Sequence, residues 1–419
     1  MSSAKRVLVV GDYRQTITVV RSLARAGFEV LLGTDDPRSS TALSRYVSRV
    51  WTYDRAGSER FYDQLESYLR IEQPGFVFTV GESQLRRLIR EPERFEPLSC
   101  WAMPDPQTVE RCFDKRALFA LCPELGIPVP AWCEYTNAAD WRVQARAMGL
   151  PVIVKRKDSA IRVRERKAFI VQTEAELDAF LANVEADPDP KSLVLQKFAP
   201  GVRHNCHIAA ADGELVAYFE QKVLRTDELD DTGIGTAGIS VEPNARLRTH
   251  CERMLKALNY TGIGCIQFLV QGNQFAFLEM NPRMDSTAML PYRLGYDFPR
   301  LAIRLAAYRK ARNAGMHSLA ACLLPNALDK PYTIGKRYHW LQGELHSWIT
   351  AARRGRLGAV DLSARALEMI RSALVSYHLT FELADPLPTL YAFWKKYAPL
   401  PMRRRAPRAL LRSARSAAG

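Results

Sequence analysis

Residues 262–283 read GIGCIQFLVQGNQFAFLEMNPR, and this stretch decides the fold. Two apolar runs, 265–270 and 275–281, flank the turn Gln271-Gly272-Asn273. Apolar runs joined by a short turn that contains glycine are typical of an antiparallel β-hairpin. We therefore predict two paired strands at this point of the chain.

Three oxygen-bearing side chains interrupt the apolar hairpin: Gln267, Glu279 and Asn281. Glu279 and Asn281 are two residues apart, so they share one face of their strand. Burying such groups is costly unless something compensates, and Mg²⁺ takes oxygen ligands with only one or two carboxylates. Arg283 follows on the same side, where it can neutralise a phosphate. A structural Glu279–Arg283 salt bridge is the alternative, but it accounts for neither Asn281 nor Gln267.

Length and charge limit the number of domains and the kinds of partner that the sequence allows. The 419 residues are enough for two or three domains. From Pro386 onward there are eight Lys and Arg residues and no acid, which leaves +6 of the net charge of +14 for the rest. This basic tail predicts either attachment to an anionic membrane surface or acidic partner, or a solvated terminus. Nucleic-acid binding is not favoured, because no recognised module accompanies the charge.

Targeting and cysteine patterns favour the cytoplasm. No window approaches 18 uninterrupted apolar residues, and the apolar run before Gly11 is too short for a secretory signal. We expect a cytoplasmic protein, or a peripheral one at the inner face of the membrane through its basic tail. The eight cysteines show no CxxC pair and no Cys/His spacing of a zinc site, so we expect reduced thiols.

The N-terminal segment predicts a doubly wound domain over residues 1–105. A buried strand near 7–10, an amphipathic helix and a strand over 28–33 form a βαβ unit, and a third strand is expected over 75–80. Ligands bind at the carboxyl ends of such strands, where Asp12 and Glu82 stand. A GxGxxG fingerprint is absent, which argues against dinucleotide binding.

The rest of the chain predicts a mixed α/β and α+β architecture. Strands and helices alternate from residue 106 to 312, in two expected lobes of about 106–196 and 197–312. Beyond Gly315 the strand alternation is lost, and 313–419 is expected to form a helical, basic C-terminal region. We find no internal repeat.

FLEMNPR preceded by IQF resembles the metal-binding strand pair of the ATP-grasp superfamily, especially its carbamoyl-phosphate-synthase-like and carboxylate–amine ligase branches. The resemblance extends from about residue 7 to residue 305. It implies a pre-ATP-grasp domain followed by a two-lobed ATP-grasp domain. It also implies ATP with Mg²⁺ or Mn²⁺, metal ligands at Glu279, Asn281 and Gln267, and a phosphate and acyl-phosphate contact at Arg283.

Other segments match the family in order. DKRALFALCPELGIPVP and PVIVKRK resemble the segments that carry its two ATP-contacting lysines, and LVLQKFAPG resembles the hinge that receives adenine. The implied ATP-binding residues are Lys115, Lys155, Gln196, Lys197, Phe198, Lys222 and Asn281, with Lys155 and Arg283 as the catalytic cations.

The chain departs from the family at three places. The hinge has Lys197 where glutamate is usual, and Arg203 stands where a ribose-binding acid is common. The loop DSAIRVRERKA, which corresponds to the phosphate-covering loop, contains no glycine. Its basic residues can clamp phosphate by charge or form a lid over an anionic substrate: Arg162, Arg164, Arg166 and Lys167.

The resemblance implies an ATP-dependent ligase that joins a small-molecule carboxylate to an amine or related nucleophile through an acyl phosphate. Position alone makes four residues substrate candidates: Asp12, Glu82, Arg164 and Arg293. Two alternatives stay open, a non-catalytic ATP-binding protein attached to a membrane or partner through the basic tail, and an ATP-dependent kinase. Homodimer formation also stays open.

Overall fold

The computed structural model describes residues 5–55, 58–158, 161–164, 166–324, 326, 330–353, 355 and 357–398. The basic residues of the tail from 399 onward lie outside this range. Among the described helices, none has the length and hydrophobicity that a bilayer crossing requires. All eight cysteines are free thiols, and six of them are buried, as expected.

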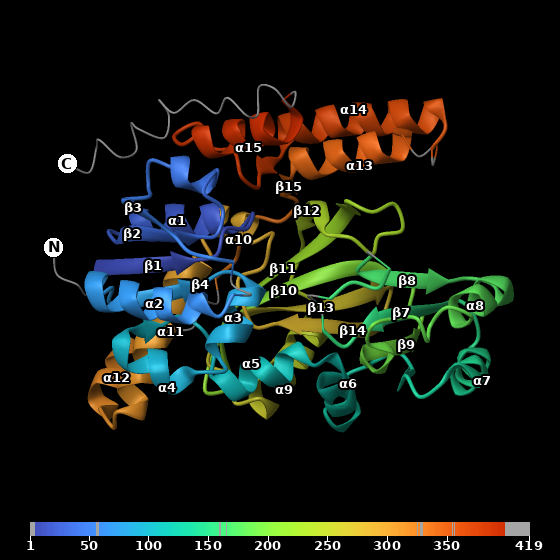
Figure 1. Cartoon of the computed structure of the whole chain (residues 1–419), viewed down its shortest axis with the longest axis horizontal. Helices are drawn as coiled ribbons and strands as arrows, with labels where there is room; N and C mark the ends of the chain where they lie inside the picture. The colour runs from blue at the N-terminus through green and yellow to red at the C-terminus, as the bar shows by residue number, and fades with distance from the viewer. Residues whose placement is uncertain are drawn as a thin grey trace.

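The N-terminal domain is a parallel five-stranded sheet in the order β3-β2-β1-β4-β5 (Figure 1). Residues 7–10 of the central strand β1 are all apolar and buried because both faces of the sheet are covered. Val7 and Val9 pack in one core with α1, whereas Leu8 and Val10 pack in another with α2. The doubly wound prediction is confirmed. The elements are β1 (Arg6–Val10), α1 (Thr16–Arg25), β2 (Glu29–Thr34), β3 (Arg49–Thr52), α2 (Arg60–Glu72), β4 (Phe76–Thr79), α3 (Glu82–Leu88), α4 (Pro92–Phe95) and β5 (Cys100–Trp101).

A smaller lobe follows, built on an antiparallel four-stranded sheet in the order β6-β9-β7-β8. Its core is formed by one face of the sheet and two helices, with Trp141 and Phe180 buried against Leu195. The elements that lead into and form this lobe are α5 (Pro106–Phe113), α6 (Lys115–Glu124), β6 (Trp132–Glu134), α7 (Ala138–Met148), β7 (Val152–Arg156), β8 (Ala168–Val171), α8 (Glu174–Leu181) and β9 (Leu193–Lys197).

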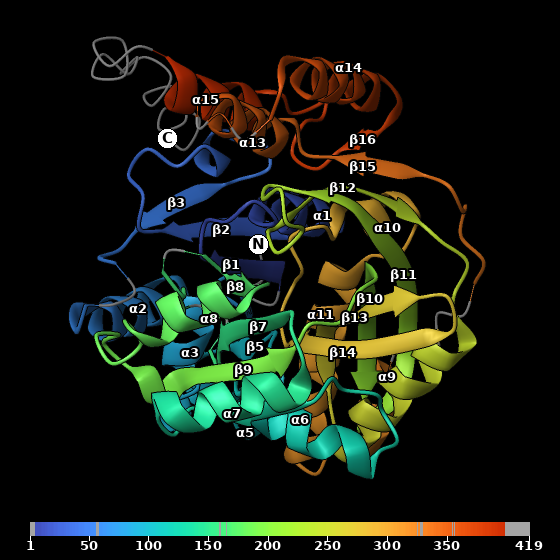
Figure 2. The ribbon, with the colours of Figure 1, turned by 90° about the vertical axis from the view of Figure 1, so that its right-hand side faces the viewer.

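The larger lobe carries a seven-stranded sheet in the order β14-β13-β10-β11-β12-β15-β16. Figure 2 shows this sheet beside the smaller lobe, with β14 nearest to β9 and β7. The predicted hairpin is confirmed: β13 and β14 pair antiparallel across the turn at 271–273. The elements up to residue 313 are β10 (Val202–Ala211), β11 (Glu214–Thr226), β12 (Gly235–Ser240), α9 (Ala245–Ala257), β13 (Gly262–Gln271), β14 (Gln274–Asn281), α10 (Met289–Arg293) and α11 (Phe298–Asn313).

The C-terminal region is mostly helical, as predicted, but the expectation that it lacks strands was wrong. Two short strands extend the large sheet, and β15 pairs antiparallel with β12, Tyr338 opposite Gly238. The pairing depends on glycine, because a Cβ at Gly238 would lie 2.3 Å from the Tyr338 ring. Strands this short leave no periodic pattern in a sequence. The elements are α12 (His317–Leu323), β15 (Arg337–His339), α13 (Leu341–Arg353), α14 (Ala359–Val375), β16 (Tyr377–His378) and α15 (Leu387–Tyr397).

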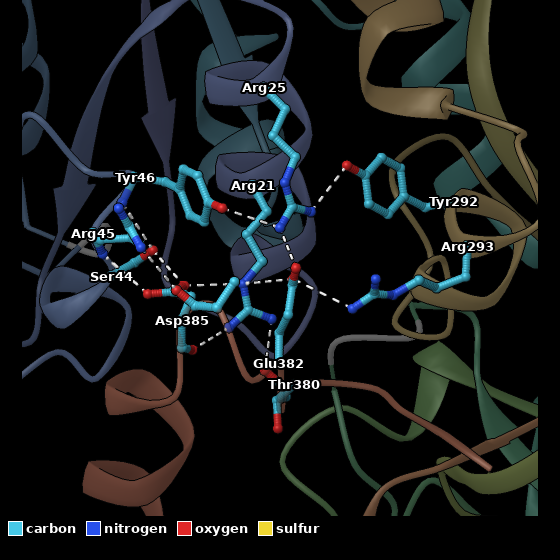
Figure 3. Close-up of polar contacts among 11 residues, drawn as sticks. Arg21, Arg25, Ser44, Arg45, Tyr46, Tyr292, Arg293, Thr380, Glu382 and Asp385 are labelled. Atoms are coloured by element: carbon cyan, nitrogen blue, oxygen red, sulfur yellow. Dashed lines mark hydrogen bonds and ion pairs between the residues drawn. The ribbon is translucent and has the colours of Figure 1, made fainter.

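A buried ionic junction joins the C-terminal region to the N-terminal domain (Figure 3). Arg21 of α1 donates to Asp385 over 3.0 Å, and the two side chains are only 4% and 2% exposed. Asp385 also accepts from the Ser44 hydroxyl at 2.7 Å and from the backbone N–H of Arg45 at 3.0 Å. Both oxygens of this buried carboxylate therefore accept hydrogen bonds, which is the condition for a buried ion pair to be tolerated.

Candidate active site

A cavity of about 620 Å³ lies where the N-terminal domain, the two lobes and the loop between β11 and β12 meet. Its walls are rich in charged and amide side chains, which core packing alone does not explain. The side chains of this kind that line it are Gln15, Glu82, Lys115, Lys155, Lys167, Gln196, Lys197, Arg203, Asn205, Asp230, Asp231, Gln267, Glu279, Asn281, Arg283 and Asp285.

The strand pair β13–β14 places the three predicted oxygen donors on the cavity wall. Gln267 stands opposite Glu279 in the ladder, and Asn281 Nδ2 donates to Glu279 Oε1 over 3.0 Å. The bulky neighbours Phe268 and Phe277 are fully buried in the core of the large lobe. Gln267 and Phe268 are adjacent and so lie on opposite faces of β13. On β14 a β-bulge at Leu278 turns Glu279 to the cavity although Phe277, two residues earlier, is in the core. Gln267, Glu279 and Asn281 together form the arrangement expected of a hard-cation site.

Three lysines surround Glu279. Lys115, at the start of α6, lies with its Nζ 3.5 Å from Glu279 Oε2. Lys155, on β7, donates to Gln196 Oε1 over 3.0 Å. Burial, aided by the nearby Lys115, lowers the pKa of Lys155 to about 8, although Glu279 opposes this shift. Burial also lowers the pKa of Lys167. Crowded cations with depressed pKa values favour an anionic ligand.

Arg283 and Glu82 form an ion pair on the wall of the same cavity. Arg283 Nη2 lies 3.2 Å from Glu82 Oε2, and Glu82 Oε1 also pairs with Arg86 at 2.8 Å. Burial alone would raise the pKa of Glu82, but Arg283 and Arg86 hold it below its usual value. Arg283 Nε is buried and has no partner among the described residues. This guanidinium is therefore oriented by Glu82 and keeps a donor for a ligand.

The segment expected to act as hinge borders the cavity. The backbone N–H groups of Lys197 and Phe198 already donate to Ala131 and Pro151, over 2.8 and 3.2 Å. Lys197 Nζ donates to the Gly149 carbonyl at 2.6 Å, so the Lys197 side chain is directed toward the smaller lobe. Gln196 Nε2 is buried without an acceptor in the part of the chain that the structure describes. Gln196 is thus the hinge side chain with an unused donor.

The basic loop contributes less to the cavity than its charge suggests. Lys167 is the described basic residue of this loop that lines the cavity. Arg166 pairs with Asp230 at 3.7 Å, across the cavity entrance. The expectation that Arg164 contacts substrate was wrong: its guanidinium packs 4.4 Å from the Phe180 ring centre and donates to the Phe180 carbonyl.

Lys222, a predicted ATP contact, lies on the wrong face of β11. It stands opposite His204 in the ladder, on the face that Glu220 also occupies, whereas Gln221 points to the opposite face. Lys222 is not among the residues that line the cavity. A shift of one residue along a strand reverses the side that a side chain occupies, and the prediction is corrected for this reason.

Two substrate candidates also lie elsewhere. Asp12 accepts from the Thr41 hydroxyl at 2.6 Å, outside the cavity, and burial raises its pKa. Arg293 of α10 pairs with Glu382 at 3.3 Å in the junction that Figure 3 shows. Arg293 thus helps to seat the C-terminal region, which sequence reasoning treated as a separate unit. Glu82 is the predicted substrate candidate that the structure places at the cavity.

Sequence reasoning missed three residues on the cavity wall: Asn205, Asp285 and Thr287. Asn205 stands beside Gln267 in the sheet, which only the pairing of β10 with β13 reveals. Asp285 follows Arg283 by two residues, and this spacing in the sequence could have predicted a further site residue on the same side of the chain. All three are more than nine-tenths buried.

Comparisons with known proteins agree with this geometry. The model of the ATP-grasp domain family matches residues 120–292, which include β7, the hinge and the β13–β14 pair. Residues 120–292 of the chain thus form an ATP-grasp domain. The carbamoyl phosphate synthase large chains of Rubrobacter xylanophilus and Thermus thermophilus are each 25% identical to it, over 304 and 323 residues. These matches cover 70% and 74% of this chain, but only 28% and 30% of those proteins.

Solved structures share the fold. A complex of biotin carboxylase from Campylobacter jejuni aligns with a TM-score of 0.60 at 18% identity, over 72% of this chain and 70% of that one. N5-carboxyaminoimidazole synthetase from Staphylococcus aureus, complexed with ADP, aligns with a TM-score of 0.56 at 13% identity, over 71% and 76% of the two chains. At these identities the likeness establishes the ATP-grasp fold, and the activity has to be argued from the site.

Proposed function

We propose that this ATP-grasp protein is an ATP- and Mg²⁺-dependent ligase that joins a carboxylate to an amine or related nucleophile through an acyl phosphate. One observation carries the proposal. A carboxylate with two amide neighbours faces three lysines and an oriented arginine across a single cavity. That arrangement suits a polyanion bridged by a hard cation.

The oxygen donors fit Mg²⁺ in kind and number. Gln267, Glu279 and Asn281 supply one carboxylate and two amide oxygens on one strand face, and Mg²⁺ commonly completes its shell with phosphate oxygens and water. Asn281 donates its amide N–H₂ to Glu279, which leaves its oxygen for a cation. When bound, the metal neutralises charge on phosphate oxygens.

The cations are placed to hold the triphosphate. We assign the ATP phosphates to Lys115, Lys155 and Lys167, and the transferred phosphoryl group to Arg283. Gln196 Nε2, buried and without an acceptor among the described residues, is suited to a purine ring nitrogen. Electrostatic stabilisation of this kind is usually the largest contribution to phosphoryl transfer.

In the first proposed step a substrate carboxylate oxygen attacks the γ-phosphorus of ATP, and the bond to the β-phosphate oxygen breaks with its electron pair to leave ADP. In the second step the neutral amine nitrogen attacks the acyl carbon, and the acyl C–O bond breaks with its electron pair so that phosphate leaves. The proton that the nitrogen loses is taken up by the departing phosphate. Arg283, held by Glu82, stays beside the phosphoryl group through both steps. Positioning and charge neutralisation supply the catalysis, without a covalent enzyme intermediate.

Ion pairs tie the basic loop to the N-terminal domain and to the large lobe, and we propose that they hold this loop as a cover that keeps water from the acyl phosphate. Arg86 joins α3 of the N-terminal domain to Asp158 at the start of the basic loop, over 2.7 Å. Arg166 joins the same loop to Asp230 of the large lobe. Exclusion of water prevents hydrolysis of a reactive intermediate.

The proposal is tested by ADP release against a panel of amino acids and other carboxylates, singly and in pairs, with and without Mg²⁺. A ligase requires two substrates and the metal. ADP release with a single co-substrate, which becomes phosphorylated, indicates a kinase. Intact ATP binding without turnover on any pair indicates a non-catalytic ATP-binding protein.

We also propose that the basic tail attaches the protein to an anionic membrane surface. The support is the charge of the sequence, since residues 399–419 lie outside the described part of the chain. Lys395 is already engaged by Asp36 and by the Arg38 carbonyl, so it contributes little to such attachment. The arginines after residue 402 are then the relevant charges.

A further inference from the structure

A row of polar side chains crosses four strands of the large sheet on its cavity side. Glu279 stands opposite Gln267, Gln267 opposite Asn205, and Asn205 opposite Gln221. Neighbouring strands lie about 4.8 Å apart. Asn205 and Gln221 are therefore about 10 and about 14 Å from Glu279 by the strand spacing. The proposed metal ligands occupy only the first part of this row.

Thr287 organises the far end of the row. Its hydroxyl accepts hydrogen bonds from Asn205 Nδ2, at 3.5 Å, and from Gln221 Nε2. It donates its own proton to Asp285 Oδ1, which also accepts the Thr287 backbone N–H at 2.8 Å. A hydroxyl has a single proton to donate, so both amides must present their N–H₂ groups to it. The amide oxygens consequently point away from Thr287.

Three acceptor atoms are left without donors at this place. Asn205 Oδ1 and Gln221 Oε1 are buried and have no hydrogen-bond partner within the described residues. Among the described residues, the Asp285 carboxylate accepts its two hydrogen bonds at Oδ1, which leaves Oδ2 without a hydrogen-bond donor and the carboxylate without an ion pair. The three residues are 3%, 0% and 7% exposed. Leaving such acceptors unpaired is costly, so the arrangement calls for a ligand rich in donors.

The charges around Asp285 define that ligand further. Arg14, His207, Cys265, Arg283 and Tyr338 act on it electrostatically from the surrounding elements. Burial alone would raise the pKa of Asp285, but His207 and the hydrogen bonds from Thr287 hold it below its usual value. The carboxylate is thus ionised at neutral pH. A primary ammonium group carries one positive charge and three N–H donors, which matches one carboxylate and two amide oxygens.

We propose that Asp285, Asn205 and Gln221 bind the acceptor substrate of the ligase through its primary ammonium group. This proposal rests on the function proposed above and names the class of nucleophile. Asp285 is two residues from Arg283 and lines the same cavity. An acyl phosphate held by Arg283 and an ammonium held by Asp285 are therefore neighbours, and the Asp285 carboxylate is placed to take the proton that the ammonium must lose before its nitrogen can attack. Primary amines are favoured over fully substituted amines and over alcohols, which lack three N–H donors.

A metal ion is the competing occupant. Ligand atoms of His207, Cys265 and Asp285 lie within 4.8 Å of one another, and all three residues are buried. Elemental analysis of the purified protein separates the two occupants. We expect no stoichiometric transition metal. A bound metal that is retained by the wild type and lost in Cys265→Ser would overturn the proposal.

Saturation-transfer-difference NMR tests binding directly, in the presence of Mg²⁺ and ATP. Methylammonium is the probe, and tetramethylammonium is the control with the same charge and no N–H donor. We expect transfer to the methyl protons of methylammonium in the wild type and in Asp178→Asn, a surface control, but not in Asp285→Asn. Tetramethylammonium should receive none. An equal signal for both cations, an equal signal in Asp285→Asn, or no methylammonium signal in the wild type contradicts the proposal.

A second variant guards against misfolding of Asp285→Asn. Asn205→Ala removes one acceptor and keeps the carboxylate, so we expect a weaker methylammonium signal with an unchanged melting temperature within about 2 °C, since it disrupts no ion pair. An undiminished signal in Asn205→Ala would remove this residue from the site. Elemental analysis and melting curves of each variant accompany the NMR.

Turnover supplies an independent test. Hydroxylamine, uncharged at neutral pH, traps an acyl phosphate without an ammonium site, whereas methylamine requires one. With a carboxylate from the panel, Asp285→Asn should lower kcat/KM for methylamine by about 10- to 100-fold and leave hydroxamate formation nearly unchanged. Equal losses for both nucleophiles would assign Asp285 to the fold or to the first step. If no carboxylate gives hydroxamate, the ligase proposal fails, while the NMR result still decides the ammonium site.

Discussion

Replacing Glu279 by glutamine should abolish ADP formation and leave the fold intact. Glu279 is the carboxylate between the two amide donors Gln267 and Asn281 on the β13–β14 pair. The substitution preserves the shape of the side chain but removes the negative charge from this donor set. Glu82, another carboxylate on the cavity wall, does not replace it, because Glu82 is already paired with Arg283 and Arg86.

The size of the effect follows from the loss of one preorganised charge. Loss of a single stabilising group in an active site typically costs about 100- to 1,000-fold in kcat, which corresponds to about 2.7 to 4 kcal/mol. Glu279 also pairs with Lys115 at 3.5 Å, and its side chain is 23% exposed. A partly exposed pair at this distance contributes at most about 1 kcal/mol to folding. Catalysis should therefore suffer far more than stability.

A coupled assay of ADP release, run across a Mg²⁺ titration, measures the effect. Glu279→Gln should show at least about a 100-fold lower rate at every metal concentration, with a free energy of unfolding within about 1 kcal/mol of the wild type. Glu174→Gln, an exposed change in the smaller lobe, is the matched control and should behave as the wild type. Normal turnover in Glu279→Gln would refute the metal assignment.

Three further outcomes follow from the structure. Because the pKa of Lys155 is lowered to about 8, this lysine loses its charge as pH rises from 7 to 9, and the Kd of MgATP measured by calorimetry should rise by up to about tenfold. Lys155→Met should bind MgATP weakly and without this pH dependence. A wild-type Kd that does not change between pH 7 and 9 would contradict the assignment of Lys155 to the ATP phosphates. Asp385→Ala removes the nearest carboxylate from the buried Arg21, which keeps only Glu382 at 3.5 Å. Denaturant unfolding should therefore show a loss of up to about 3 to 5 kcal/mol, whereas the exposed Asp178→Ala should lose less than about 1 kcal/mol. Deleting residues 399–419 should spare turnover and remove sedimentation with anionic vesicles, and equal sedimentation of both forms would retire the membrane proposal.

The hairpin could be predicted because its signals are local. The turn at 271–273 sets the register, and the two-residue spacing of Glu279 and Asn281 places both side chains on one face. The order of strands and helices in the N-terminal domain could be predicted equally well, because its buried strands are continuous apolar runs between glycines. Local patterns therefore predicted the proposed metal ligands and the strands and helices around them.

The remaining features depend on contacts between distant segments. Asn205 enters the site through the pairing of β10 with β13, and its side chain reaches Thr287, 82 residues away in sequence. Lys222 was misplaced because its strand direction was known but its register was not. Arg293 was misplaced because its partner, Glu382, belongs to a C-terminal region whose docking left no local signal.

The central claim is that a carboxylate oxygen attacks ATP, and isotope transfer tests it most directly. A carboxylate from the panel that supports ADP release is labelled with ¹⁸O in both oxygens and incubated with the protein, MgATP and the amine. Formation of an acyl phosphate and its capture by the amine must leave one ¹⁸O atom in each inorganic phosphate, as read by mass spectrometry. Phosphate that contains no ¹⁸O, formed together with the amide product, would contradict the proposed mechanism.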